Sequence, residues 1–220
     1  MDAEAVALVP ATGLGERFGN RDPEALVRVR GVPLVVHAVR GLLNAGCVRR
    51  VVVAAPVSHV DIVRAALADA NADALVVPGG ADRGESVRLA LKAALAESPD
   101  LSVVLVHDVT RAFSPPELVR AVVAAVAGGA PAVVPVLPVA DTVKRVDADE
   151  IITETVSRAQ LRSVQTPQGF TVDVLAAADG IDDAERLGVP VSTVPGHPAA
   201  MKVGTPFDLA VAEALLGAGS

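Results

Sequence analysis

The chain has 220 residues, of which 51% are hydrophobic, so it is long enough to bury the core of a single α/β domain. Only 2% of the residues are aromatic and the formal net charge is −7, which excludes the stacking surfaces and basic patches of nucleic-acid binders. The first residues are acidic, and no apolar stretch reaches the ~18 residues of a membrane span. We therefore expect a cytoplasmic protein without a membrane anchor.

The hydrophobic pattern alternates between short β-branched runs and longer stretches of helical period, which is typical of a three-layer α/β fold. It predicts, in chain order, strand 5–9, helix 32–45, strand 48–55, helix 58–70, strand 74–77, helix 84–97, strand 102–107, helix 115–127 and strand 132–137. The residues from Ser114 to Glu117 form a predicted capping box for the last of these helices. This alternation implies right-handed crossovers and a mostly parallel sheet with helices on both faces.

The pattern changes after Pro138, where polar and β-branched residues alternate without Ala-rich helices. We expect residues 139–165 to leave the main sheet as a protruding β-arm. Because an isolated hairpin is only marginally stable in water, the arm is expected to pack on a partner subunit. The chain then returns through a helix at 172–179, strands at 191–195 and 201–203, and a last helix at 206–216. Residues 1–220 are thus predicted to form one domain with a dimerisation arm.

The loop after the first strand runs from Pro10 to Glu24 and reads PATGLGERFGNRDPE. Gly13 and Gly15 allow backbone N–H groups to face an anion, and Arg17 adds a positive charge. Phe18 stands where a Rossmann fingerprint has its third glycine, which argues against an NAD-dependent oxidoreductase, and the Gly-Lys-hydroxyl sequence of a Walker A loop is missing. Spacing alone leaves two interpretations open: a loop that wraps a nucleoside triphosphate, and a purely structural turn.

Two further turns follow strands at the edge of the sheet where ligands bind in open α/β folds. In the HDVTR motif, Asp108 could bind a metal or a substrate hydroxyl and Arg111 a phosphate, or the two residues could simply cap a helix. In the PGGADRGES turn, the backbone amides of Gly80 and Ala81 could contact a base edge, and Ser86 a ribose or phosphate. That second signal is weak by itself, because many strand-to-helix turns have such a composition.

The last third of the chain adds polar residues at the ends of predicted elements: Asp141, Thr142, Lys144, Arg158, Thr166 and Lys202. As isolated residues they could equally be solvated surface, where most Lys and Arg side chains lie. The single cysteine, Cys47, is expected to be a spectator, and the four histidines show no zinc-site spacing. A GxSxG nucleophile motif is also absent from the sequence.

Taken in order, seven segments of the chain resemble the 2-C-methyl-D-erythritol 4-phosphate cytidylyltransferases of the non-mevalonate isoprenoid pathway. They are VPATGLGERFG, PGGADRGESV, VLVHDVTRAF, PVADTVKR, the segment around Arg158, VQTPQGF and AAMKVGTPFDL, and they span roughly residues 6–210. The resemblance implies a Rossmann-like nucleotidyltransferase sheet and a homodimer whose arms exchange. It also implies a Mg²⁺-dependent reaction of CTP with the sugar-alcohol phosphate.

The resemblance further implies a role for each matching position. Arg17 would steady the triphosphate in the transition state, with Arg158 and Lys202 as the other catalytic residues. Nucleotide binding would involve Pro10, Ala11, Gly13, Gly15, Gly80, Ala81 and Ser86, and binding of the sugar phosphate would involve Asp108, Arg111, Thr142 and Thr166 together with Arg158 and Lys202. Thr142 and Arg158 are expected to reach in from the partner's arm. Asp108 is also the candidate Mg²⁺ ligand.

Glu24 departs from the family pattern, which has a lysine after the proline of the first loop and uses it on the triphosphate. A change from Lys to Glu alters the local charge by two units, which costs several kcal/mol if the side chain points inward. Two interpretations are open. In the first, Arg21 replaces the missing cation while Glu24 turns to solvent or assists Mg²⁺. In the second, the chain is a paralogue that binds nucleotide, sugar phosphate or a protein partner without turnover. Further departures are residues 181–184, which lack the family's threonine, and Thr12 and Thr110, each in place of an alanine.

Overall fold

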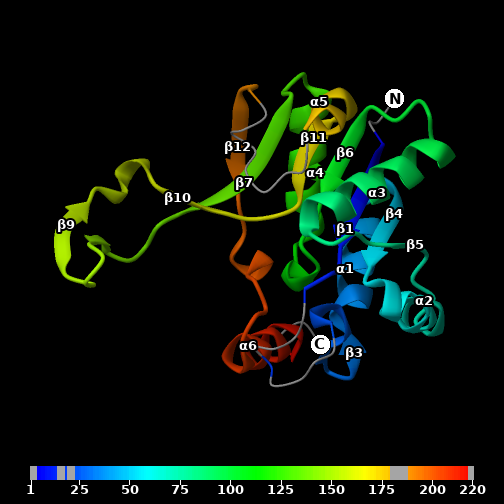
Figure 1. The fold of residues 1–220 in the computed structure, drawn as a ribbon, viewed down its shortest axis with the longest axis horizontal. Coiled ribbons are helices and arrows are strands. Elements are labelled where there is room, and N and C mark those ends of the chain that lie inside the picture. Colours follow the sequence, from blue (N-terminus) through cyan, green and yellow to red (C-terminus); the bar gives the residue numbers. More distant parts are fainter. Residues whose placement is uncertain (1–3, 14–17, 19–22, 179–187, 218–220) are drawn as a thin grey trace.

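The computed structural model describes residues 4–13, 18, 23–178 and 188–217 of the chain. Within these ranges, eight strands form one sheet in the order β10-β7-β11-β6-β1-β4-β5, and β12 also pairs with β7 (Figure 1). The strands are β1 (Ala5–Pro10), β4 (Val48–Ala55), β5 (Leu75–Pro78), β6 (Val103–Val106), β7 (Ala132–Pro138), β10 (Arg162–Val164), β11 (Gln168–Thr171) and β12 (Val191–Pro195). β10 and β11 run antiparallel to their neighbours, and the remaining pairs are parallel. The expected mostly parallel α/β sheet is confirmed.

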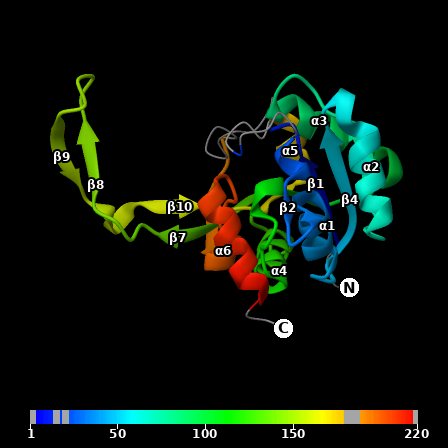
Figure 2. The same cartoon turned by 90° about the horizontal axis from the view of Figure 1, so that it is seen from below.

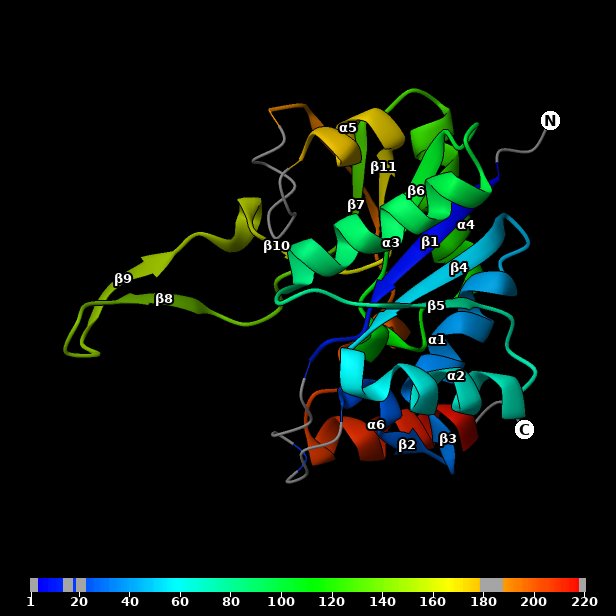
Figure 3. The same cartoon turned by 45° about the vertical axis from the view of Figure 1, so that its right-hand side comes forward.

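Helices cover both faces of the sheet and so complete the three predicted layers (Figure 3). One face is covered by α1 (Leu34–Leu43), α2 (Val60–Asp69), α4 (Pro116–Ala127) and, at its margin, α6 (Pro206–Gly217). The other face is covered by α3 (Arg83–Glu97) and α5 (Val172–Ala177). A short hairpin of β2 (Arg28–Val29) and β3 (Val32–Pro33) leads into α1.

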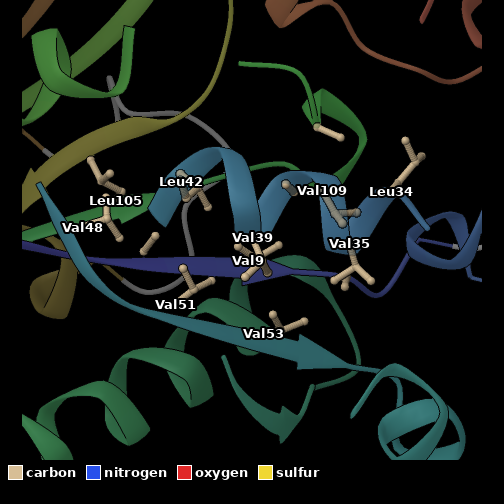
Figure 4. Packing of buried hydrophobic residues seen from close by; sticks show 14 of the residues in the cluster. Val9, Leu34, Val35, Val39, Leu42, Val48, Val51, Val53, Leu105 and Val109 are labelled. Atoms are coloured by element: carbon tan, nitrogen blue, oxygen red, sulfur yellow. The ribbon is translucent and has the colours of Figure 1, made fainter. Parts of the chain in front are cut away.

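The centre of the sheet is buried on both sides, because alternate residues of each strand face different helical layers. All six residues of β1 are buried. Val9 and Val53 face α1, where Val35, Val39 and Leu42 repeat at helical spacing and lie in the same cluster (Figure 4). Burying a side chain of this size stabilises the fold by about 1.5–3 kcal/mol. This packing explains why the first strand reads as a continuous apolar run rather than an alternating one.

The parallel strands bring their carboxyl ends to one edge of the sheet. Pro10 of β1 lies opposite Ala54 of β4, and Ala55 lies opposite Pro78 of β5. On the other side of β1, Leu8 lies opposite Val106 at the end of β6. The loops after β1, β5 and β6 therefore start close together, as the sequence predicts.

An antiparallel hairpin of β8 (Val143–Val146) and β9 (Ile152–Val156) stands away from the body of the molecule (Figures 1 and 2). Arg145 and Glu154 form an ion pair of 2.9 Å across it, and Lys144 donates a hydrogen bond of 2.7 Å to Thr155. The end of the predicted arm differs from expectation, because residues 162–164 form β10 and pair with β7 in the main sheet.

Two local predictions are wrong, and one strand was not predicted. Ser114 does not cap α4: the N-cap is Pro115, and the Ser114 hydroxyl instead donates to the carbonyl oxygens of Arg111 and Thr166, at 3.1 and 3.0 Å. Residues 201–203 are not a strand but a connection before α6. The strand β11 was not predicted, although it lies between β6 and β7 with Phe170 fully buried. Among the helices of the described ranges, none is long and apolar enough to cross a membrane.

Candidate active site

The loops after β1 and β5 touch each other at the carboxyl edge of the sheet. A Cβ atom placed on Gly79 would lie 2.9 Å from the methyl carbon of Thr12 and 3.2 Å from the carbonyl oxygen of Ala55. Position 79 therefore has no room for a side chain. The two glycine-containing turns that the sequence pointed to form neighbouring parts of one surface.

The loop after β1 begins as an extension of the sheet. Pro10 and Ala11 are buried, and the amide of Ala11 donates to the carbonyl oxygen of Ala54 at 2.8 Å. Gly13 is exposed, so its backbone is accessible to a ligand. Gly15, Arg17 and Arg21 lie outside the described residues, and the expectations placed on them stay predictions.

Glu24 lies directly against this loop. It begins a short 3₁₀ turn, Glu24–Leu26, and its amide donates to the carbonyl oxygen of Gly13 at 3.0 Å. The Glu24 side chain also lies against Gly13, because a Cβ atom placed on Gly13 would lie 2.7 Å from Oε2 of Glu24. The carboxylate is thus beside the glycine loop, where a negative charge opposes the binding of phosphate.

The turn after β5 is held by its own side chains. Ser86 is fully buried, and its hydroxyl accepts from the amide of Gly80 at 3.0 Å and donates to the carbonyl oxygen of Asp82 at 2.7 Å. Glu85 accepts from the amide of Ala81 at 2.7 Å, and Asp82 caps α3 by accepting from the amide of Glu85. The amides of Gly80 and Ala81 therefore have internal partners here, and a ligand that used them would replace the bonds to Ser86 and Glu85.

Asp108 is the centre of a polar cluster at the end of β6. Its Oδ1 accepts from the amide and the hydroxyl of Thr110, at 3.0 and 2.7 Å, and its Oδ2 lies 3.7 Å from Nζ of Lys202. Burial alone would raise the pKa of Asp108, but the hydrogen bonds from Thr110 and the charge of Lys202 hold it below its usual value. The carboxylate is therefore ionised at neutral pH. Asp108 caps the turn, as one interpretation of HDVTR expects, and its role toward a metal ion or a substrate hydroxyl stays a prediction.

Thr166 and Lys202 reach this cluster from distant parts of the chain. The hydroxyl of Thr166 accepts from the amide of Asp108 at 3.0 Å, and the amide of Val203 donates to the carbonyl oxygen of Thr110 at 2.8 Å. Asp108, Thr166 and Lys202 are thus brought together as predicted. Across the same region, the amide side chain of Gln165 donates to the carbonyl oxygens of His197 and Ala200, at 2.9 and 3.3 Å.

The guanidinium of Arg111 has backbone partners within the chain, and the phosphate-binding role expected of it stays a prediction. Its guanidinium donates to the carbonyl oxygens of Ala200 and Val164, at 2.8 and 3.1 Å, and so ties β10 to the segment before Lys202. Burial lowers the pKa of Arg111 somewhat and the nearby Asp108 raises it. A guanidinium has five N–H donors, so these two bonds leave capacity for an anion. In this arrangement Arg111 supports the wall of the site.

Thr142 directly precedes β8 and Arg158 follows β9, so they flank the hairpin that stands apart from the body in Figure 1. Arg158 donates to the carbonyl oxygen of Ala140, and no hydrogen bond or ion pair of the described residues joins it or Thr142 to the Asp108 cluster. Within the described part of the chain, no group of three or more His, Cys, Asp or Glu side chains is arranged to hold a metal ion. Cys47 is half-buried and burial raises the pKa of its thiol, as suits a spectator.

Sequence reasoning missed His107 and Gln165, which both support the site. His107 is 1% exposed and its Nδ1 lies 3.1 Å from Oγ1 of Thr166. Each missed residue directly precedes a predicted site residue, His107 before Asp108 and Gln165 before Thr166. In an extended segment, neighbouring side chains point to opposite sides of the chain. A polar residue directly before a site residue is therefore expected to point into the protein behind the site, and this was the signal that the sequence offered.

Comparison with known proteins assigns these features to a single family. The family described as "IspD: 2-C-methyl-D-erythritol 4-phosphate cytidylyltransferase" matches residues 5–218. A relative of the same name from Saccharopolyspora erythraea is 59% identical over 220 residues, which cover 96% of this chain and 98% of that protein. A relative from Nocardia farcinica is 50% identical and covers 98% of this chain and 95% of that one.

Solved structures agree with the sequence relatives. The 2-C-methyl-D-erythritol 4-phosphate cytidylyltransferase of Thermus thermophilus superposes with a TM-score of 0.75 at 33% identity, covering 98% of each chain. The 4-diphosphocytidyl-2C-methyl-D-erythritol synthase of Anaerococcus prevotii has a TM-score of 0.82 at 23% identity and covers 99% of this chain, which supports the fold.

Proposed function

The chain belongs to the 2-C-methyl-D-erythritol 4-phosphate cytidylyltransferase family, and from this we propose that it joins CTP and 2-C-methyl-D-erythritol 4-phosphate to give the CDP-alcohol and pyrophosphate. It is a nucleotidyltransferase of isoprenoid biosynthesis. The observation that carries the proposal is the match over residues 5–218, which includes every loop of the site. Relatives of this name at 46–59% identity support it over nearly the full length.

We divide the proposed site into two halves. The adjoining loops after β1 and β5 suit the nucleotide, because the exposed backbone of Gly13 allows phosphates to approach closely. Asp108, Thr166 and Lys202 suit the sugar-alcohol phosphate, since carboxylate and hydroxyl groups can bind the polyol hydroxyls while the ammonium binds the phosphate.

The reaction needs alignment and charge neutralisation more than proton transfer. A phosphate monoester is already an anion near neutral pH, so its oxygen attacks the α-phosphorus of CTP without a general base. That oxygen forms the new P–O bond while the bond to the β-phosphate oxygen breaks, and pyrophosphate leaves with the electron pair. Lys202 is proposed to offset the negative charge of the two substrates as they approach each other. Arg17, from the first loop, is proposed to offset the charge that develops on the leaving pyrophosphate.

Mg²⁺ is a further part of this proposal. When bound, it would draw together the triphosphate oxygens and neutralise part of their charge. Asp108 fits a direct metal role poorly, because Oδ1 is taken by Thr110 and Oδ2 faces the ammonium of Lys202. One or two carboxylates together with substrate phosphates commonly hold Mg²⁺.

A homodimer completes the proposed site. Thr142 and Arg158 lie on an arm that stands away from the body, and the arm carries the exposed apolar residues Val146, Ile151 and Ile152. We propose that this arm packs on a second copy and places Arg158 and Thr142 at that copy's Asp108 cluster. A cytoplasmic location, where CTP is available, is part of the same proposal.

The direct test is release of pyrophosphate from CTP and 2-C-methyl-D-erythritol 4-phosphate in the presence of Mg²⁺. Release that requires both substrates and the metal ion is expected. UTP and ATP in place of CTP, and erythritol 4-phosphate in place of the methylated substrate, test the choice of base and polyol. Purified protein that releases no pyrophosphate at saturating substrates would contradict the proposal.

One observation favours a second candidate function. The carboxylate of Glu24 lies beside the glycine loop, where the family has a cation, and this suits a protein that binds the sugar phosphate or nucleotide without turnover. Calorimetric titration separates the two candidates. Binding of either substrate by a protein that is inactive as wild type but active as Glu24→Lys would identify the binding role.

A further inference from the structure

His107 connects two residues of the sugar-phosphate half of the site. It follows β6 directly, and its side chain is buried behind the site rather than exposed in it. Its Nδ1 lies 3.1 Å from Oγ1 of Thr166, and that same oxygen accepts the amide hydrogen of Asp108 at 3.0 Å. The backbone of Thr166 is held as well, because Ser114 donates to its carbonyl oxygen at 3.0 Å. Thr166 is therefore fixed at both its backbone and its hydroxyl.

The direction of these hydrogen bonds follows from the protonation of His107. Its pKa is lowered to about 4, mainly by burial and also by the nearby charge of Arg111, which together outweigh the opposing effect of Asp108. The ring is neutral at neutral pH and has one N–H. Oγ1 of Thr166 has two partners among the described residues, and one of them, the amide of Asp108, can only donate. Nδ1 of His107 is therefore the partner that can take the hydrogen of this buried hydroxyl. Nδ1 then accepts the hydroxyl hydrogen of Thr166.

This arrangement determines what Thr166 can offer a ligand. Its hydrogen is committed to His107 and one lone pair takes the amide of Asp108, so a single acceptor lone pair is left. We propose that His107 is a positioning residue that holds the Thr166 hydroxyl as an acceptor beside the Asp108 carboxylate. The two acceptors then select hydroxyl groups of the polyol, while its phosphate goes to Lys202. This inference rests on the proposed cytidylyltransferase function.

The first test compares His107→Leu with His107→Asn. Leucine keeps an apolar side chain of similar bulk without a hydrogen-bond acceptor, whereas the amide oxygen of asparagine can take the place of Nδ1 and accept from Thr166. Loss of one such hydrogen bond corresponds to about a tenfold change. We expect His107→Leu to raise KM for 2-C-methyl-D-erythritol 4-phosphate about tenfold while KM for CTP changes by less than about twofold. His107→Asn is expected to keep KM for 2-C-methyl-D-erythritol 4-phosphate close to the wild-type value.

A second test asks whether His107 acts through Thr166. In a Thr166→Val background the hydroxyl is gone, so His107→Leu should add little, and the two changes should be strongly non-additive. Equal effects on both KM values, or additive effects of the two substitutions, would overturn the proposal and leave His107 as ordinary packing.

A third measurement uses the wild-type protein, so it does not require any variant to fold. The ¹⁵N shifts of the His107 ring in the wild type should show an unprotonated Nδ1 and a protonated Nε2 from about pH 6 to pH 8. A protonated Nδ1 in this range would overturn the assignment of Thr166 as an acceptor. Absence of pyrophosphate release by the wild type is a different result, since it refutes the proposed function while the ring shifts still test the hydrogen-bond chain.

Discussion

Replacing Glu24 with lysine tests whether the carboxylate beside Gly13 opposes nucleotide binding. Its Oε2 lies 2.7 Å from the position a Cβ atom would take on Gly13. If a phosphate on the amides of this loop is taken to lie about 7 Å from the carboxylate, two unit charges interact by about 2 kcal/mol at an effective dielectric of ~20. The substitution changes the charge by two units, which gives about 4 kcal/mol. Because Glu24 is only half-buried, solvent and salt reduce this to about 2 kcal/mol.

A gain of about 2 kcal/mol corresponds to a rise of roughly 30-fold in kcat/KM for CTP. Steady-state pyrophosphate release at varied CTP measures it, with Glu24→Gln expected to give about half the free-energy gain because it changes one unit of charge. Glu213→Lys, at an exposed position of α6, is the control for net charge and should leave kcat/KM unchanged. An unchanged kcat/KM in Glu24→Lys would refute the electrostatic reasoning, and a fall would show that the carboxylate itself assists the reaction.

Three further predictions follow from other parts of the structure. Lys202→Met should lower kcat/KM for the sugar phosphate about 10- to 100-fold and raise the pKa of Asp108, because a charge-assisted contact is lost; kinetics and ¹³C NMR titration check the two effects. Gly169→Ala should destabilise the protein by about 1–3 kcal/mol, read as a lower Tm, since its Cβ would lie 2.6 Å from Cγ1 of Val122. The free energy of unfolding, measured by urea titration, should fall by about 3 kcal/mol as the pH is lowered from about 6.5 to 4, because His107 binds its proton more weakly in the folded protein. A pH-independent midpoint over this range would contradict the last prediction.

Much of the fold could be predicted because the elements follow local patterns. The strand at 48–55 agrees with β4 at both ends, and the helix at 84–97 begins within one residue of α3. β11 could not be predicted in the same way. It has only four residues, and its place between β6 and β7 depends on the long-range packing of Phe170 and Gly169 against helices and strands distant in sequence.

The shared edge of the sheet was predictable from the sequence, but the contacts of the candidate site residues were not. The carboxyl ends of parallel strands must share an edge, so Asp108 and the glycine turns could be placed together in advance. No period in the sequence states where a side chain in a loop points, and the contact between Glu24 and Gly13 became visible only in the structure. The same holds for Arg111, whose two carbonyl partners lie on segments that are 53 and 89 residues further along the chain.

The close approach of Thr12 to Gly79 packs the loop after β1 against the turn after β5. A Cβ atom on Gly79 would lie only 2.9 Å from the Thr12 methyl carbon, so a side chain introduced at position 79 would push against the first loop. In the proposed function, a substitution at position 79 would therefore disturb the loop proposed for the triphosphate as well as the turn proposed for the base. Attempts to broaden the choice of nucleotide would be better directed at Glu85, whose side chain lies against Gly80 and accepts from the amide of Ala81 at 2.7 Å.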